Sequence, residues 1–157
     1  MTESIKRYVF RSLLALVIVA ALATVCFIGN AVVLRVQWRD LRHEINGAFS
    51  AAHTQGATME YGGVTLKMGE DALNYYHAIL FNNYTTAYKR GNTGPTAEST
   101  FFYLPGGTLV FTPKDGGDAV HIQWTSDGGT KGYYLRGQSY SRLGNFFSNC
   151  VRNAQTE

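Results

Sequence analysis

The side chains that could bind a metal ion or activate a substrate are few and scattered along the chain. Four histidines occur among the 157 residues: His43, His53, His77 and His121. No two of them are four residues apart, the spacing with which one helix presents two imidazoles to a zinc ion. Asp115 and Asp118 flank a Gly-Gly turn, but they lack the alternating oxygen ligands and closing glutamate of a calcium loop. We therefore expect no metal site and no cofactor.

Nucleophilic catalysis has equally little support. Cys150 has Phe146 and Phe147 four and three residues before it, which predicts a small core residue instead of a reactive thiolate. Cys26 lies in an apolar segment, so the two cysteines are not expected to form a disulfide. No serine lies in a strand-turn-helix elbow, and the Gly-Gly pairs fall between predicted strands instead of before helices. The sequence therefore predicts a protein that is not an enzyme.

The excess of basic residues lies beside the apolar segment. The net charge is +3, of which residues 1–11 contribute +2, residues 35–55 contribute +1 and residues 56–157 contribute zero. Nucleic-acid binding needs a concentrated basic face, which a neutral domain does not provide. We therefore expect no nucleic-acid partner.

An uncharged segment at residues 12–34 predicts a transmembrane helix, preceded by a short basic tail at residues 1–11. At about 1.5 Å per residue, 23 residues reach roughly 34 Å, enough for a hydrocarbon core of about 30 Å. Tyr8 and Trp38 flank the segment as candidate membrane-interface anchors. The alternative is a cleaved signal peptide, for which Ala21-Leu22-Ala23 or Gly29-Asn30-Ala31 would be the cleavage site.

The positive-inside rule does not decide the orientation, because three basic residues lie on each side of the span. A short N-terminal tail before a long domain is typical of a signal anchor with a cytoplasmic N-terminus. We therefore expect a single-pass membrane protein whose C-terminal domain is extracytoplasmic.

Apolar spacing predicts an α+β fold for the rest of the chain. Trp38, Leu41, Ile45, Phe49 and Ala52 recur every three or four residues, which predicts that the membrane helix continues as an amphipathic juxtamembrane helix over residues 35–55. Residues 56–157 then form a small domain. It has a strand at Val64–Met68 and a helix that begins at Gly69-Glu70-Asp71, carries Ala87 on its buried stripe and closes at Lys89-Arg90.

Four short antiparallel strands and a last helix complete the predicted domain. The strands are Phe101–Leu104, Thr108–Thr112, Ala119–Thr125 and Lys131–Arg136, and Asp-Gly and Gly-Gly pairs between them favour tight hairpins. The last helix is predicted from Ser139 to Arg152. The predicted sheet is therefore a strand-helix-four-strand meander, packed by the C-terminal helix.

Alternation along these strands predicts two faces. We expect a core face covered by the two later helices, formed by Phe102, Leu104, Leu109, Phe111, Val120, Ile122, Trp124, Tyr133 and Leu135. The other face is unusually aromatic for a solvated surface. Its candidate interaction residues are Phe101, Tyr103, His121 and Tyr134. Cover by the juxtamembrane helix and a docking surface are the two interpretations that stay open.

The layout of an apolar N-terminal helix, an amphipathic helix and a small antiparallel sheet resembles that of type IV pilins and pseudopilins. The family's glycine-phenylalanine cleavage site and its glutamate five residues into the mature helix have no match around Ser12–Val19. The resemblance implies a structural subunit that assembles through its N-terminal helix, and homo-oligomers through that helix would follow. The leading hypothesis is a membrane-tethered, non-enzymatic interaction or sensing domain. Its expected partners are the lipid bilayer and another membrane or envelope protein.

Overall fold

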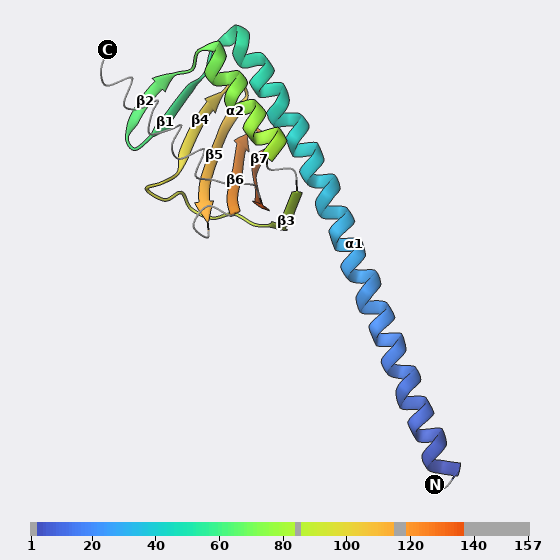
Figure 1. The fold of residues 1–157 in the computed structure, drawn as a ribbon. Coiled ribbons are helices and arrows are strands. Elements are labelled where there is room, and N and C mark those ends of the chain that lie inside the picture. Colours follow the sequence, from blue (N-terminus) through green and yellow to red (C-terminus); the bar gives the residue numbers. More distant parts are fainter. Residues whose placement is uncertain (1–2, 84–85, 115–118, 137–157) are drawn as a thin grey trace. The chain divides into compact units, whose positions relative to one another are not determined.

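The computed structural model describes residues 3–83, 86–114 and 119–136, and it divides the chain into two compact units, Met1–Val33 and Leu34–Glu157. One helix, α1 (Glu3–Gln55), contributes to both units (Figure 1). Its part in the first unit is apolar and carries exposed large side chains from Leu13 to Val33. This helix is long and apolar enough to cross a membrane. The polar Thr24 is accommodated because its hydroxyl donates to the carbonyl of Ala20 at 2.8 Å.

The part of α1 beyond Leu34 belongs to the folded domain. Its predicted apolar stripe, Trp38, Leu41, Ile45, Phe49 and Ala52, is buried. The helix ends at Gln55, and Gly56 follows with φ 82° while its N–H donates to the carbonyl of Ala52. A left-handed glycine after the last turn is a common helix stop, because it lacks the Cβ that would clash there.

The domain contains a seven-stranded sheet in which every neighbouring pair is antiparallel. The strands are β1 (Thr58–Tyr61), β2 (Val64–Lys67), β3 (Thr86–Arg90), β4 (Thr100–Leu104), β5 (Gly107–Lys114), β6 (Ala119–Ser126) and β7 (Gly129–Arg136), in the order β2-β1-β4-β5-β6-β7-β3. The helix α2 (Glu70–Asn83) connects the two edge strands, β2 and β3, and therefore crosses the sheet from one edge to the other.

The α+β class is confirmed, but the predicted sheet was too small. The prediction missed β1, which pairs with β2 through a turn at Gly62 and Gly63, both with positive φ. It also extended the helix too far, because α2 ends at Asn83 while Ala87, Lys89 and Arg90 belong to β3 and pair with β7. Pairing with β7 stabilises an extended conformation there, which helical spacing alone could not indicate. The predicted helix at Ser139–Arg152 lies outside the described residues.

The nine residues predicted for the core face of the sheet are all buried. Of the two helices predicted to cover this face, α2 does so, and α1, which was not predicted there, lies beside it (Figure 1). Cover by the predicted C-terminal helix lies outside the described residues. Phe49 of α1 and Tyr76 of α2 both contact Phe102 on β4. The juxtamembrane helix therefore does not cover the opposite, aromatic face. Trp38 is also corrected: it is 5% exposed and packs on Tyr133, so it is a core residue and not a membrane-interface anchor.

A carboxylate on α1 fixes the helix to the hairpin of β6 and β7. Glu44 accepts hydrogen bonds from the indole N–H of Trp124 at 2.7 Å, the hydroxyl of Ser126 at 3.1 Å and the ammonium of Lys131 at 2.7 Å. The hydrogen bond from Lys131 is the main reason that the pKa of Glu44 is lowered from its ordinary value, with burial opposing the shift. The Lys131–Glu44 pair is partly exposed, whereas Trp124 is buried, so the indole is the group that depends most on this carboxylate.

We expect Glu44→Ala to lower the free energy of unfolding of the domain by about 1–3 kcal/mol, because the buried indole N–H of Trp124 would lose its acceptor. The matched control, Lys131→Met, removes only the partly exposed ion pair and should cost less than about 1 kcal/mol. Chemical denaturation of the full chain in detergent micelles, followed by tryptophan fluorescence, measures both. Equal losses in the two variants would contradict this assignment.

Candidate functional site

The four residues predicted as an interaction surface form two separate pairs on the second face of the sheet. Phe101 and Tyr103 on β4 stack with their rings 6.5 Å apart and 12° from parallel. Tyr103 is exposed and its hydroxyl donates to Glu60 at 2.8 Å. This hydrogen bond raises the pKa of the Tyr103 hydroxyl, because the proton is held between the two oxygens. Strand β5 lies between this pair and the other.

The second pair is His121 on β6 and Tyr134 on β7, which face each other across the two strands with ring centroids 4.7 Å apart. His121 is completely buried, which corrects its expected role as a contact residue. Its Nε2 donates to the carbonyl of Gly91 at 2.7 Å, so the imidazole fastens the loop after β3 to the sheet. Burial lowers the pKa of His121, and the Gly91 carbonyl opposes this shift.

Tyr88 extends this part of the surface, and sequence reasoning missed it because residues 87–90 were placed on a helix. The guanidinium of Arg136 lies 5.1 Å from the centre of the Tyr88 ring, and the ammonium of Lys89 lies 5.3 Å from that of Tyr134. Both distances suit cation–π attraction, which holds charge and ring together at the surface. We use the term aromatic face for Phe101, Tyr103, Tyr134 and Tyr88. The alternation of small, aromatic and basic residues in Thr86–Arg90 was the signal for a strand.

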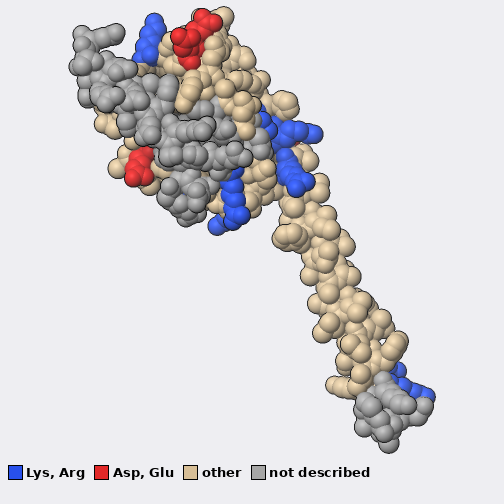
Figure 2. Space-filling model, viewed as in Figure 1, with Lys and Arg blue, Asp and Glu red and all other residues tan. Residues whose placement is uncertain are grey.

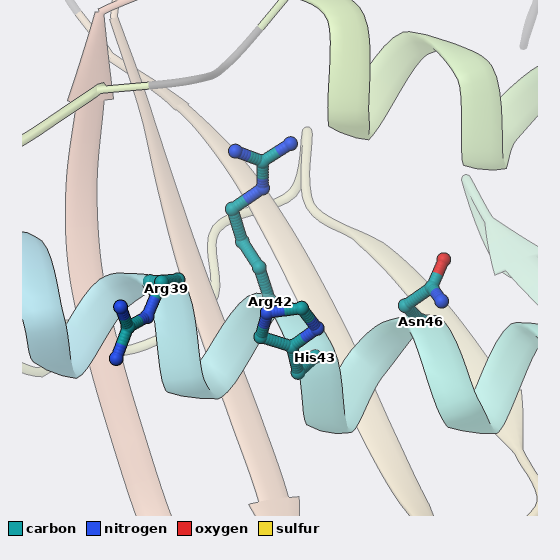
Figure 3. Close-up of a pocket in the computed structure, with 4 residues that line it drawn as sticks. All are labelled: Arg39, Arg42, His43 and Asn46. Carbon is teal, nitrogen blue, oxygen red and sulfur yellow. The ribbon is translucent and has the colours of Figure 1, made fainter.

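A pocket of about 290 Å³ lies along α1 and is lined by Arg39, Arg42, His43 and Asn46 (Figure 3). His77 Nε2 of α2 donates to Asn46 Oδ1 at 2.5 Å, which joins the two helices at the edge of the pocket. Burial is the main cause of the lowered pKa of His77, and this lowered pKa favours the neutral imidazole. The guanidinium groups of Arg39 and Arg42 extend from α1 in different directions (Figure 3), and that of Arg39 donates to Asp40.

Of the described residues that line the pocket, none carries a carboxylate. Asp40 pairs with Arg39 at 3.3 Å, but both side chains are about two-thirds exposed, at 63% and 66%. Figure 2 shows basic side chains gathered where α1 enters the domain. Within the described ranges no three His, Cys, Asp or Glu residues are close enough to hold a metal ion. The described lining of the pocket is therefore basic and polar.

Comparisons of this chain with protein-family models, with curated proteins and with solved structures found no match.

Gly132 provides the space in which the Gly91 loop meets β7. A Cβ at this position would run into the Gly91 carbonyl and the Asn92 side chain, and it would lie 2.9 Å from His121 Nε2. We expect Gly132→Ala to lower the free energy of unfolding by about 1–3 kcal/mol, as overpacking of a filled site does. Gly94→Ala, where a Cβ would meet nothing within 4 Å, should stay within about 0.5 kcal/mol of wild type. Denaturation of the full chain in micelles measures both, and a neutral Gly132→Ala would contradict the assigned contact.

Proposed function

We propose that this protein is a single-pass, membrane-tethered interaction module without enzymatic activity, and that its folded domain is extracytoplasmic. The observation that carries the proposal is that the apolar side chains of α1 are exposed in its first part and buried in its last part. Large apolar side chains are exposed up to Val36, and the same helix enters the domain core at Trp38. An exposed apolar surface of this length is unfavourable in water and favourable in a bilayer. The tether is therefore built from the same helix as the domain.

The tether can be tested by fractionation. The full chain should sediment with membranes, resist carbonate extraction and keep its N-terminal residues by intact mass. Val19→Arg combined with Ala23→Arg places two charges mid-span, each costing roughly 2.5–3.5 kcal/mol of insertion, and should move the domain to the soluble fraction. Val9→Arg, in the basic tail, is the matched control and should leave it in the membrane.

Two outcomes would contradict the tether or its direction. A soluble domain that lacks the apolar segment would mean that this segment is a cleaved signal peptide. Protection of the domain from protease added outside intact cells, with digestion only after lysis, would place it in the cytoplasm.

The aromatic face is the proposed contact surface, and its partner is an acidic segment of another membrane or envelope protein. Tyrosine and arginine are enriched among residues that dominate binding energies, and tyrosine buries a large area at low entropic cost. Tyr88 and Tyr103 are about 40% exposed. Lys89 and Arg136 lie over two of the rings, and within the described residues neither pairs with a carboxylate. A partner with acidic side chains would complement this charge.

A photo-crosslinking amino acid at Tyr103 tests this contact in cells. We expect one discrete crosslinked protein, and we expect its band to be lost after Lys89→Glu with Arg136→Glu because like charges then oppose the acidic partner. Lys67→Glu, on the exposed edge strand β2, should keep the band. Without the crosslinker, Tyr103→Phe should retain partner binding and Tyr103→Ser should lose it, both with unfolding free energies within about 0.5 kcal/mol of wild type.

Three results would overturn the proposed contact. If Tyr103→Ser lowers the free energy of unfolding as much as a core substitution does, this ring belongs to the core. Crosslinks that survive the charge reversal would rule out an acidic partner. Crosslinks to a second copy of the chain alone would favour an assembly subunit, the structural alternative suggested by the pilin-like layout.

A further inference from the structure

A pocket of about 430 Å³ opens beside the aromatic face, between the β1–β2 turn and the loop that precedes β4. Its described lining includes Glu60 of β1, Phe101 of β4, both glycines of the turn, and Thr96 and Ser99 of the loop. Glu60 and Phe101 are register partners on neighbouring strands, so their side chains leave the same face of the sheet directly opposite each other. A carboxylate and an aromatic ring therefore line one concave site.

The loop wall of this pocket is fixed to the sheet at both of its ends. Near β4, the hydroxyl of Ser99 accepts a hydrogen bond from the Thr96 N–H at 2.7 Å and forms another with the hydroxyl of Thr112 on β5 at 2.8 Å. Near β3, the Gly91 carbonyl accepts a hydrogen bond from His121. Ser99 and Thr112 are buried, so their hydroxyls are used inside the protein. The pocket is therefore preformed, which lowers the entropic cost of binding a ligand in it.

Glu60 brings to the pocket a negative charge that no described cation balances. Its carboxylate accepts one hydrogen bond from a neutral group, the Tyr103 hydroxyl at 2.8 Å, and none of the described lysines and arginines forms an ion pair with it. Lys67 lies on the same face of β2, two residues beyond Thr65, which pairs with Glu60. Lys67 lines a different pocket, together with Glu70. The half-buried carboxylate of Glu60 therefore keeps acceptor positions for a ligand.

Phe101 adds an aromatic surface that attracts positive charge. Its ring is half-buried and stacks on Tyr103 with the two planes 12° apart, so the protein sets its orientation. The face of an aromatic ring carries partial negative charge and attracts a cation within about 6 Å of its centre. An anion in this pocket would be repelled by Glu60, and a purely apolar group would bury the carboxylate without a partner. The chemistry of the lining therefore selects a cation.

We propose that this pocket binds an organic cation, an ammonium or guanidinium group on an aliphatic stem. The charged group donates to the Glu60 carboxylate while the stem packs against the ring of Phe101. A volume of about 430 Å³ lies within the range of about 300–1,000 Å³ that is usual for small-ligand pockets. The cation can belong to a basic side chain of the partner protein or to a free amine. Lys89 and Arg136 lie over rings at the other end of the aromatic face and prefer groups of the opposite charge, so this site is separate from the contact with an acidic segment.

Nuclear magnetic resonance of the full chain, labelled with nitrogen-15 in uncharged detergent micelles, tests the site. The probes are N-acetyl-lysine methylamide and its uncharged analogue N-acetyl-norleucine methylamide. We expect the lysine probe to shift the amide signals of Gly63 and Phe101 saturably, and the norleucine probe to leave them unchanged. Glu60→Gln keeps a hydrogen-bond acceptor but removes the charge, and should weaken binding about tenfold. Asp127→Asn removes the same charge from the β6–β7 turn, is the matched control, and should bind as wild type does.

Crosslinking at Tyr103 identifies the source of the cation. Loss of the crosslinked band in Glu60→Gln, but not in Asp127→Asn, would assign the cation to a side chain of the partner, whereas a band kept in both variants, with the lysine probe bound, would assign it to a free amine. Equal shifts with the norleucine probe, or equal weakening in Asp127→Asn, would overturn the site. Absence of lysine-probe binding together with a band that Glu60→Gln leaves unchanged would also overturn it. Because the probes bind without a partner, failure of this site is distinguishable from failure of the proposed function.

Discussion

The packing of α1 against the sheet determines where every candidate surface of the domain lies. One side of the helix is buried through Trp38, Leu41 and Ile45, and Glu44 is bonded to the β6–β7 hairpin beside it. A helix has 3.6 residues per turn, so fixing the directions of these side chains also fixes those of the other side chains on this part of the helix. Arg39 and Arg42 must then lie on the opposite flank, where Asn46 meets His77 of α2. The pocket is therefore a consequence of how the helix is held.

Because of the same packing, neither α1 nor α2 lies on the second face of the sheet. Both α1 and α2 cover the core face, so neither of them supplies apolar cover for Phe101 or Tyr103. Hydrogen bonding to Glu60 and stacking of the two rings order this surface without burying it. At the other end of the sheet, His121 is buried by holding the Gly91 loop, and only Tyr134 and Tyr88 stay accessible beside their cations. Order without burial is the property expected of a preformed binding surface.

Sequence reasoning predicted the features that depend on periodicity and missed those that depend on pairing. The apolar stripe of α1 and the core face of the predicted four-strand meander follow directly from spacing, and all of these residues are buried. Residues Thr86–Arg90 were assigned to a helix because Ala87 continued its stripe, although a partner strand about fifty residues later stabilises them in an extended form. The strand Thr58–Tyr61 was missed for a similar reason. The basic pocket was also missed, because its residues appear in sequence only as polar positions on a helical wheel.

Only a short stretch of chain separates the apolar segment of α1 from the core of the domain. Three residues, Arg35, Val36 and Gln37, separate Leu34 from the first fully buried core residue, Trp38. A chain of three residues spans about 11 Å even when fully extended, so a tethered domain cannot leave the membrane surface. Confinement of this kind raises the effective concentration of a partner in the same membrane and makes weak contacts sufficient.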